Sequence, residues 1–371
     1  MTPRSNLRRA CAALPLALAI TTGWPGLSGA QTAPPPYKPD GTVLLSGEVP
    51  PSNLLSKEGA DYLRHLIVDK PFGSGPPLAD IKAERARQDA IMRVFLDPMR
   101  RRYAVNVAEE TIGGVLVDVV TPADGVSPEN RDRVLINLHG GGFVTGARSA
   151  SLVESVPLAA LMRIKVISID YRMGPEYQFP AASQDVAAVY RQVLKTHDAK
   201  RVGLYGCSAG GTLAAQSIAW FQSHDLPNPA AVGVFCSSLG QMVAGDSAHL
   251  AGGLLGSGPR RAPPPAASAS PPAPRAPTYM GDARRDDPLA YPEVSRDVLA
   301  RFPPTLLISG TRSFEFSAAL NSHNKLTAAG VQSQFHGWDG LFHAFIYNSE
   351  LPESREAYDI MVRFFDTHLA K

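Results

Sequence analysis

The pattern of hydrophobic and polar residues changes character near residue 130. Before that point, residues 56–70 and 78–102 carry apolar side chains at helical spacing. Residues 103–125 alternate like a β-hairpin with a glycine turn. Beyond residue 130, short apolar runs alternate with amphipathic segments. The sequence therefore predicts two N-terminal helices and a hairpin, followed by alternating strands and helices.

The apolar runs beyond residue 130 have the length and composition of buried strands. Expected strands cover residues 133–139, 165–171, 201–206, 230–236, 304–310 and 331–338. Helical patterns between them cover residues 184–197, 210–224 and 317–330. Continuous apolar strands separated by helices indicate a mainly parallel sheet covered on both faces. The predicted fold class is α/β.

Two segments do not fit this alternation. Residues 31–60 are rich in Pro, Gly and Ser and are expected to form an extended arm. Residues 259–278 contain eight prolines among twenty residues, so they cannot pack as a regular helix or strand. We expect them to form a proline-rich surface loop inserted in the α/β region.

The first thirty residues have the layout of a secretory signal. Arg4, Arg8 and Arg9 precede an apolar run, and a stretch of small residues follows it. The apolar run is too short to span a bilayer as a permanent helix. We therefore expect residues 1–30 to be a signal peptide cut before Gln31, the alternative being an N-terminal anchor. The mature protein is expected to be periplasmic or secreted.

Composition excludes several functional classes. Of 371 residues, 44% are hydrophobic and 19% charged, which is typical of a globular protein with a sizeable core. The chain has 36 Lys and Arg against 34 Asp and Glu, and residues 1–30 hold three of the arginines and none of the acids. The mature chain is thus nearly neutral, unlike a nucleic-acid-binding protein. Its two cysteines, Cys207 and Cys236, form no disulfide framework or metal-binding cluster with histidines.

A serine lies between an expected strand and an expected helix. Residues 206–210 read Gly-Cys-Ser-Ala-Gly, the G-x-S-x-G pattern in the context that gives it meaning. Such a turn projects the Ser208 hydroxyl from the sheet edge, and the helix N-terminus adds a partial positive charge and the Ala209 N–H. We predict that Ser208 is a nucleophile, the alternative being a coincidental glycine-rich turn.

The segment "HGGGF", residues 139–143, ends the first buried strand. Three glycines let backbone N–H groups point into a site without side chains in the way. We predict Gly141 and Gly142 as oxyanion donors together with Ala209. A phosphate-binding loop is disfavoured, because the segment lacks the lysine and the glycine spacing of such loops. His139 is expected to brace this loop rather than transfer protons.

These segments together resemble the hormone-sensitive-lipase-like branch (family IV esterases) of the α/β-hydrolases. The resemblance rests on "HGGGF", on "DYRMGPEYQFPAA" (170–182), on "GCSAGG" and on "DGLFHAF" (339–345). It implies a helical cap within residues 31–100 and an α/β-hydrolase catalytic domain over 101–371. It also implies a serine carboxylesterase for small acyl esters of short to medium chain, working through an acyl-serine without cofactor or metal.

The proton acceptor is expected late in the chain. His343 follows the last expected strand, in agreement with the order serine, acid, histidine. The resemblance places the acid after residues 304–310, where this chain has Ser313 instead of an aspartate. Glu315 could substitute, Asp246 could reach from the neighbouring strand end, or the acid is absent. We favour Glu315, because losing the acid of such a triad costs about 10⁴ in turnover.

Other positions leave alternatives open. Cys207 stands where relatives usually carry an acid, and with Cys236 it forms either a disulfide or two buried thiols. Asp170, Arg172 and Glu176 are expected to hold loops together. Four apolar residues of the N-terminal helices are either a wall of the acyl site or plain core: Leu63, Ile67, Met92 and Phe95.

Two other functions use the same scaffold. A non-catalytic receptor for small ligands is one, as in the gibberellin receptors related to the family, although His343 argues against it. An amidase or polysaccharide deacetylase is the other, because it uses the same catalytic groups. Burst kinetics on a series of acyl esters separate these functions.

Overall fold

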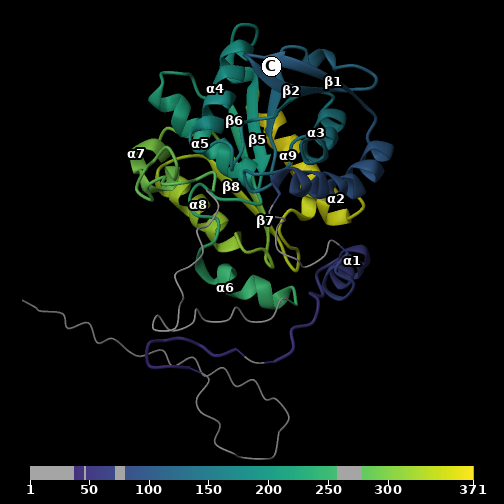
Figure 1. The fold of residues 1–371 in the computed structure, drawn as a ribbon, viewed down its shortest axis with the longest axis vertical. Coiled ribbons are helices and arrows are strands. Elements are labelled where there is room, and N and C mark those ends of the chain that lie inside the picture. The colour runs from purple at the N-terminus through teal and green to yellow at the C-terminus, as the bar shows by residue number, and fades with distance from the viewer. Residues whose placement is uncertain (1–36, 46, 72–79, 257–277, 371) are drawn as a thin grey trace, which may run out of the picture. The chain divides into compact units, whose positions relative to one another are not determined.

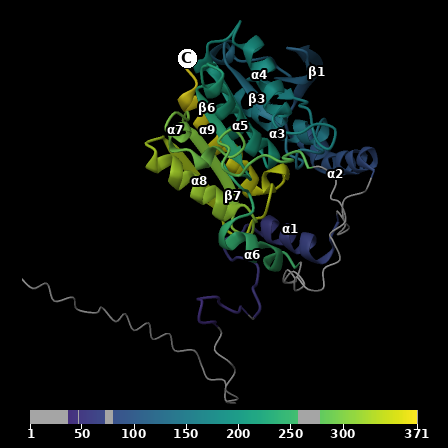
Figure 2. The ribbon, with the colours of Figure 1, turned by 60° about the vertical axis from the view of Figure 1, so that its left-hand side comes forward.

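A computed structural model describes residues 37–45, 47–71, 80–256 and 278–370 (Figures 1 and 2). The expected signal peptide, residues 1–30, and nearly all of the proline-rich segment lie outside the described residues. The chain divides into a small unit, Met1–Glu48, and a compact unit, Val49–Lys371. The helices expected as a cap belong to the same compact unit as the sheet.

The compact unit is built on an eight-stranded sheet of order β1-β2-β4-β3-β5-β6-β7-β8. β1 and β2 form the expected hairpin, β2 is antiparallel to β4, and the remaining neighbours are parallel. The strands are Val105–Ile112, Val115–Pro122, Val134–Leu138, Lys165–Ile169, Val202–Cys207, Ala231–Phe235, Thr305–Gly310 and Ser333–Trp338, from β1 to β8. The predicted α/β class is confirmed.

Helices connect the strands. They are α1 Lys57–Val68, α2 Ile81–Arg102, α3 Ser149–Met162, α4 Ala181–Val193, α5 Ala209–Ser223, α6 Gly245–Leu254, α7 Arg296–Leu299, α8 Phe316–Ala328 and α9 Pro352–His368. Short 3-10 turns cover Pro128–Asn130 (η1), Ala199–Arg201 (η2), Pro292–Val294 (η4) and Phe345–Tyr347 (η5). The predicted elements do not include α3, α6, α7 or α9. Helical periodicity does not reveal α3, because a helix that is buried on nearly all sides has no distinct polar face.

Helices cover both faces of the sheet, as expected for continuous apolar strands (Figure 1). α4, α5 and α8 pack on one face, whereas α3 and α9 pack on the other. β3 shows the alternation: Val134, Ile136 and Leu138 contact the first layer, and Leu135 contacts the second. The parallel strands end at a common edge, which gathers the segments that follow β3, β5, β7 and β8.

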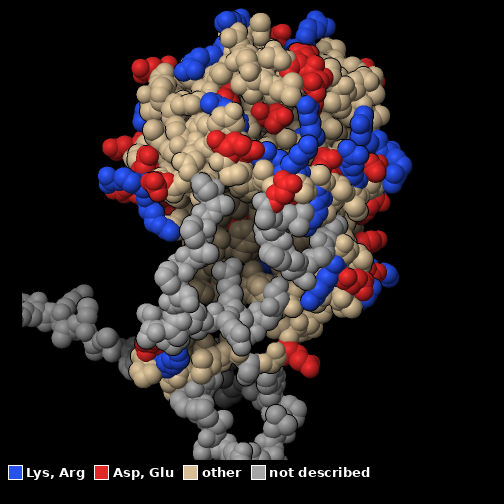
Figure 3. All heavy atoms as spheres, in the orientation of Figure 1, with Lys and Arg blue, Asp and Glu red and all other residues tan. Residues whose placement is uncertain are grey.

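Basic and acidic side chains are interspersed over the face shown in Figure 3. This distribution fits the near balance of 36 basic and 34 acidic residues in the whole chain. None of the helices in the described ranges combines the length and the apolar character that crossing a membrane requires.

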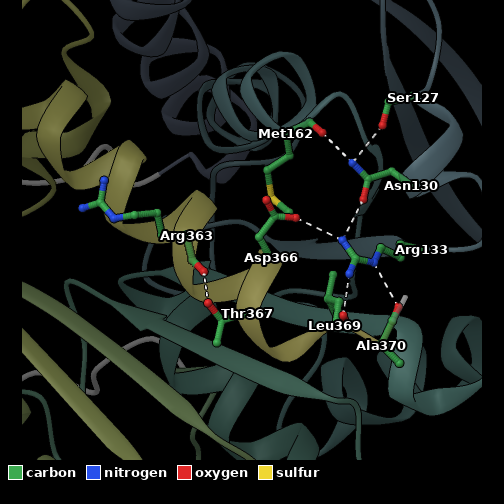
Figure 4. Close-up of polar contacts among 9 residues, drawn as sticks. All are labelled: Ser127, Asn130, Arg133, Met162, Arg363, Asp366, Thr367, Leu369 and Ala370. Carbon is green, nitrogen blue, oxygen red and sulfur yellow. Dashed lines mark hydrogen bonds and ion pairs between the residues drawn. The ribbon is translucent and has the colours of Figure 1, made fainter.

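Arg133 anchors the C-terminal end of the chain (Figure 4). Its side chain is 3% exposed and lies just before β3. Its guanidinium donates to the carbonyl oxygens of Leu369 at 2.6 Å and Ala370 at 3.0 Å, and pairs with Asp366 at 3.0 Å. These bonds hold the end of α9 against the start of β3.

Replacing this arginine should destabilise the fold. Arg133→Met removes the donors of two carbonyl groups, so we expect unfolding free energy to fall by roughly 2–4 kcal/mol. Asp366→Asn removes only the partner that is 58% exposed, and we expect a loss below about 1 kcal/mol. Urea denaturation of both variants measures the difference. Equal losses would contradict the anchoring role.

Candidate active site

Ser208 lies in a tight turn between β5 and α5. Its backbone adopts φ +58° and ψ −125°, a conformation that residues other than glycine rarely take. A Cβ at Gly210 would stand 1.8 Å from the carbonyl oxygen of Leu138, and one at Gly206 would stand 2.2 Å from it. The outer glycines of the motif are therefore required, because β3 passes directly against the turn.

The structure brings three predicted residues into one hydrogen-bonded series. Ser208 Oγ and His343 Nε2 lie 2.9 Å apart. His343 Nδ1 and Glu315 Oε2 are also 2.9 Å apart. The three residues follow β5, β8 and β7 respectively, and they meet at the common strand edge. Glu315 fixes the imidazole with its proton on Nδ1 and leaves Nε2 free to accept from Ser208.

Glu315 is completely buried immediately before α8. Ser309 Oγ donates to Oε1 at 3.0 Å, and the Ser313 hydroxyl donates to Oε2. Burial acts to raise the pKa of Glu315, but the neighbouring His343 and the hydrogen bonds from His343 and Ser313 prevail and lower it. The carboxylate is therefore held in its charged form.

Ser313 stands at the position where the resemblance places an aspartate. Its hydroxyl contributes a donor to Glu315, and the longer side chain of Glu315 covers the two-residue displacement. Asp246 lies exposed at the start of α6. Both ring nitrogens of His343 already face Glu315 and Ser208, so Asp246 is not its partner in this structure.

The glycine loop after β3 faces Ser208. Gly141 has φ +112°, and a Cβ there would stand 2.2 Å from the Thr145 carbonyl oxygen. Gly141 and Gly142 line the same cavity as Ser208 and His343. Ala209 is the first residue of α5, so its N–H has no acceptor within the helix. The three N–H groups predicted as oxyanion donors thus belong to two segments that meet at Ser208, the glycine loop and the start of α5.

His139 packs beneath this loop. It is fully buried and stacks on Tyr171 with ring centroids 4.2 Å apart. Burial lowers its pKa to about 4, so the ring is neutral and its Nδ1–H donates to the Gly140 carbonyl at 2.7 Å. These contacts support the glycine loop, as expected for His139.

A cavity of about 510 Å³ opens in front of Ser208. Part of its wall comes from α1 and α2: Tyr62, Leu66, Arg87, Gln88, Ile91, Met92 and Phe95. Among the apolar residues that the sequence singled out, Met92 and Phe95 line the cavity. Leu63 is instead a fully buried core residue, and Ile67 lies against Gly256.

Arg85 fastens α2 to the glycine loop. It pairs with both carboxylate oxygens of Glu176 at 2.7 Å, and its Nε donates to the Val144 carbonyl at 2.8 Å. Arg172 pairs with Asp185 at 2.8 Å. The segment around residues 170–176 therefore ties loops and helices together, as expected for Arg172 and Glu176.

Cys207 and Cys236 are two buried free thiols, not a disulfide. Burial raises the pKa of both thiols, which suppresses the reactive thiolate. Within the described ranges, no cluster of three or more His, Cys, Asp or Glu side chains is arranged to hold a metal ion.

Sequence reasoning missed Glu154 and Tyr347, which lie beneath the Ser208 turn and bond to each other. Burial raises the pKa of Glu154 to about 7, although hydrogen bonds from Tyr347, Asn137 and two backbone groups oppose this shift. The available signal was that Glu154 is the single charged residue in the apolar segment 149–162. A lone acid there needs buried partners.

Comparisons with known proteins now add to this geometry. A family model described as an alpha/beta hydrolase fold matches residues 135–347. The chain belongs to the α/β-hydrolase fold family. It is 30% identical over 281 residues to an acetyl-hydrolase of Streptomyces hygroscopicus, covering 72% of this chain and 89% of that protein. It is 32% identical over 251 residues to the carboxylesterase/phospholipase LipF of Mycobacterium tuberculosis (strain ATCC 25618 / H37Rv), covering 66% of this chain and 63% of LipF.

Solved structures agree with this assignment. The crystal structure of an esterase, E25, superposes with a TM-score of 0.70 at 25% identity, covering 89% of this chain and 100% of E25. An esterase from the bacterial hormone-sensitive lipase family has the same fold, with a TM-score of 0.70 at 23% identity, covering 85% of this chain and 99% of that one. The expected resemblance to this branch of the α/β-hydrolases is confirmed.

Proposed function

We propose that this α/β-hydrolase is a serine carboxylesterase that hydrolyses short- to medium-chain acyl esters through an acyl-serine intermediate. The observation that carries the proposal is the series Ser208–His343–Glu315, with both contacts at 2.9 Å, beside a cavity of about 510 Å³. Relatives named as an acetyl-hydrolase and a carboxylesterase support the class of carboxylic ester hydrolases.

Acylation follows from the positions of these groups. Ser208 Oγ attacks the ester carbonyl while His343 Nε2 takes its proton, and Glu315 stabilises the imidazolium that forms. The carbonyl oxygen becomes negative and accepts hydrogen bonds from the N–H groups of the glycine loop and Ala209. The alcohol leaves with the proton from His343. Water then attacks the acyl-serine in the same way, so the reaction requires no cofactor.

The cavity fits a small ester with an apolar group. Its volume lies within the usual range of small-molecule sites, roughly 300–1,000 Å³. Ile91, Met92 and Phe95 on α2 supply apolar wall, and Phe342 adds to it from the histidine loop. Arg87 is not free to bind a substrate anion strongly, because its guanidinium is paired with Glu84 at 2.6 Å.

Hydrolysis of a p-nitrophenyl ester series, from acetate to octanoate, tests the proposed function. Because deacylation is a separate step, we expect rapid release of about one nitrophenolate per active site, followed by slower turnover. Ser208→Ala should abolish the burst. Binding of the esters without acylation would indicate a receptor instead, and faster hydrolysis of matched anilides would indicate an amidase.

Substitution of the acid tests the role of Glu315. Glu315→Gln should lower kcat by about 10⁴-fold, because the amide no longer stabilises the imidazolium or selects its tautomer. Asp246→Asn is the control and should leave kcat unchanged, since Asp246 is exposed on α6. Steady-state kinetics give both values. Turnover by Glu315→Gln within a few-fold of the parent protein would remove Glu315 from the mechanism.

We also propose that the protein is exported and that residues 1–30 are removed. The arginines, apolar run and small residues at the start of the chain support this. Protein recovered from the periplasm or medium of a Gram-negative host should begin at Gln31 by N-terminal sequencing. Ala30→Trp should leave the precursor uncut, because the peptidase requires a small residue there. Exported protein that still begins at Met1 would contradict cleavage.

A further inference from the structure

One buried carboxylate contacts three segments of the candidate active site. Glu154 on α3 is 7% exposed. Its Oε1 accepts from the Gly140 N–H at 2.8 Å and from the Tyr347 hydroxyl at 2.5 Å. Its Oε2 accepts from Asn137 Nδ2 at 2.9 Å and from the Cys207 N–H at 3.2 Å. Each carboxylate oxygen thus has two donors.

Three of these donors adjoin groups of the proposed mechanism. Gly140 immediately precedes Gly141, a predicted oxyanion donor, and Cys207 immediately precedes the nucleophile Ser208. Tyr347 ends η5, four residues after His343. A single side chain therefore bonds to the oxyanion loop, the nucleophile turn and the histidine loop.

Close packing ties these segments to one another. A Cβ at Gly140 would stand 2.7 Å from the Tyr347 hydroxyl, 3.0 Å from the Cys207 carbonyl oxygen and 3.3 Å from Ser208 Cβ. At Gly140 the oxyanion loop is thus in direct contact with the nucleophile turn and the histidine loop. A change in the bonds to Glu154 would therefore displace the segments relative to one another.

We propose that Glu154 is a positioning residue of the esterase reaction, holding the oxyanion donors, Ser208 and His343 in register through Gly140, Cys207 and Tyr347. The inference rests on the proposed function. Tyr347 borders the cavity, whereas Glu154 lies behind the residues that line it. Glu154 therefore acts through its partners. Displacements of about 1 Å in such a site can cost 100-fold in rate.

A carboxylate suits this position because the Gly140 and Cys207 N–H groups can only donate, and each carboxylate oxygen accepts from one of them. An ionised carboxylate only accepts, and its two oxygens offer about four acceptor sites. A glutamine of the same shape would turn its NH₂ group toward the N–H of Gly140 in one orientation and toward the N–H of Cys207 in the other. Glu154→Gln therefore disturbs the bonds while nearly conserving volume.

The test compares this variant with a matched control. Asp185→Asn replaces another acid that is also 7% exposed. Asp185 lies on α4 and accepts hydrogen bonds from Arg172. Glu154→Gln should lower kcat by about 10²–10³-fold, the loss expected when oxyanion donors are misplaced, with KM changed less than about threefold. Affinity for a trifluoromethyl ketone, which forms the tetrahedral anion, should fall by a similar factor. Asp185→Asn should change neither quantity.

Tyr347→Phe provides a second, milder variant. It removes one hydroxyl and should lower kcat and ketone affinity by roughly tenfold. In the Glu154→Gln background the same change should have less effect, because Tyr347 no longer donates to a charged carboxylate.

Three results would overturn the inference. The first is a folded Glu154→Gln protein with kcat and ketone affinity within threefold of the parent. The second applies if that variant does not fold: unchanged kcat and ketone affinity in Tyr347→Phe would then reject the proposal. The third is a parent protein that neither hydrolyses esters nor is acylated, which overturns the proposed function as well. Failure of the inference alone leaves the parent burst intact.

Discussion

The site depends on keeping a charged carboxylate in a fully buried position. Transfer of an ionised carboxylate from water to a protein interior costs several kcal/mol unless hydrogen bonds replace its hydration. Glu315 receives three such bonds, from Ser309, Ser313 and the imidazole of His343. The N-terminus of α8 adds favourable partial charge beside it. The orientation of His343, and hence the basicity available to Ser208, follows from this arrangement.

The same requirement explains why a serine at position 313 suits this chain. An aspartate there would place a second carboxylate beside Glu315 in a buried position, and the mutual repulsion of two such charges would strongly raise the pKa of one of them. A hydroxyl instead donates a hydrogen bond and stabilises the single negative charge. The acid and the serine thus form one unit, in which the donor occupies the position that the resemblance assigns to the acid.

The sequence predicts the fold and the nucleophile well, because both require characteristic residues within a short stretch of sequence. A strand buried on both faces is mainly apolar, and every position of β3, β5, β6 and β7 is buried. The glycines around Ser208 are imposed by contact with β3. The acid is a different case. Choosing between Glu315 and Asp246 requires the distance from each carboxylate to the His343 ring. The spacing of these residues along the sequence does not give that distance. Glu154 is harder still, since its partners are two backbone N–H groups and two side chains, and Tyr347 lies 193 residues away in the sequence.

The position of Glu154 follows from the geometry of the sheet. β3 and β5 are adjacent parallel strands, and Leu138 and Gly206 are the last pair in their register. Beyond that pair the strands diverge into the glycine loop and the nucleophile turn, so their next buried N–H groups lose the partners that a ladder supplies. Glu154 accepts from both, at Gly140 and Cys207. The divergence that opens the site therefore also creates the need for a buried acceptor, and α3 supplies it where both loops can be held by one side chain.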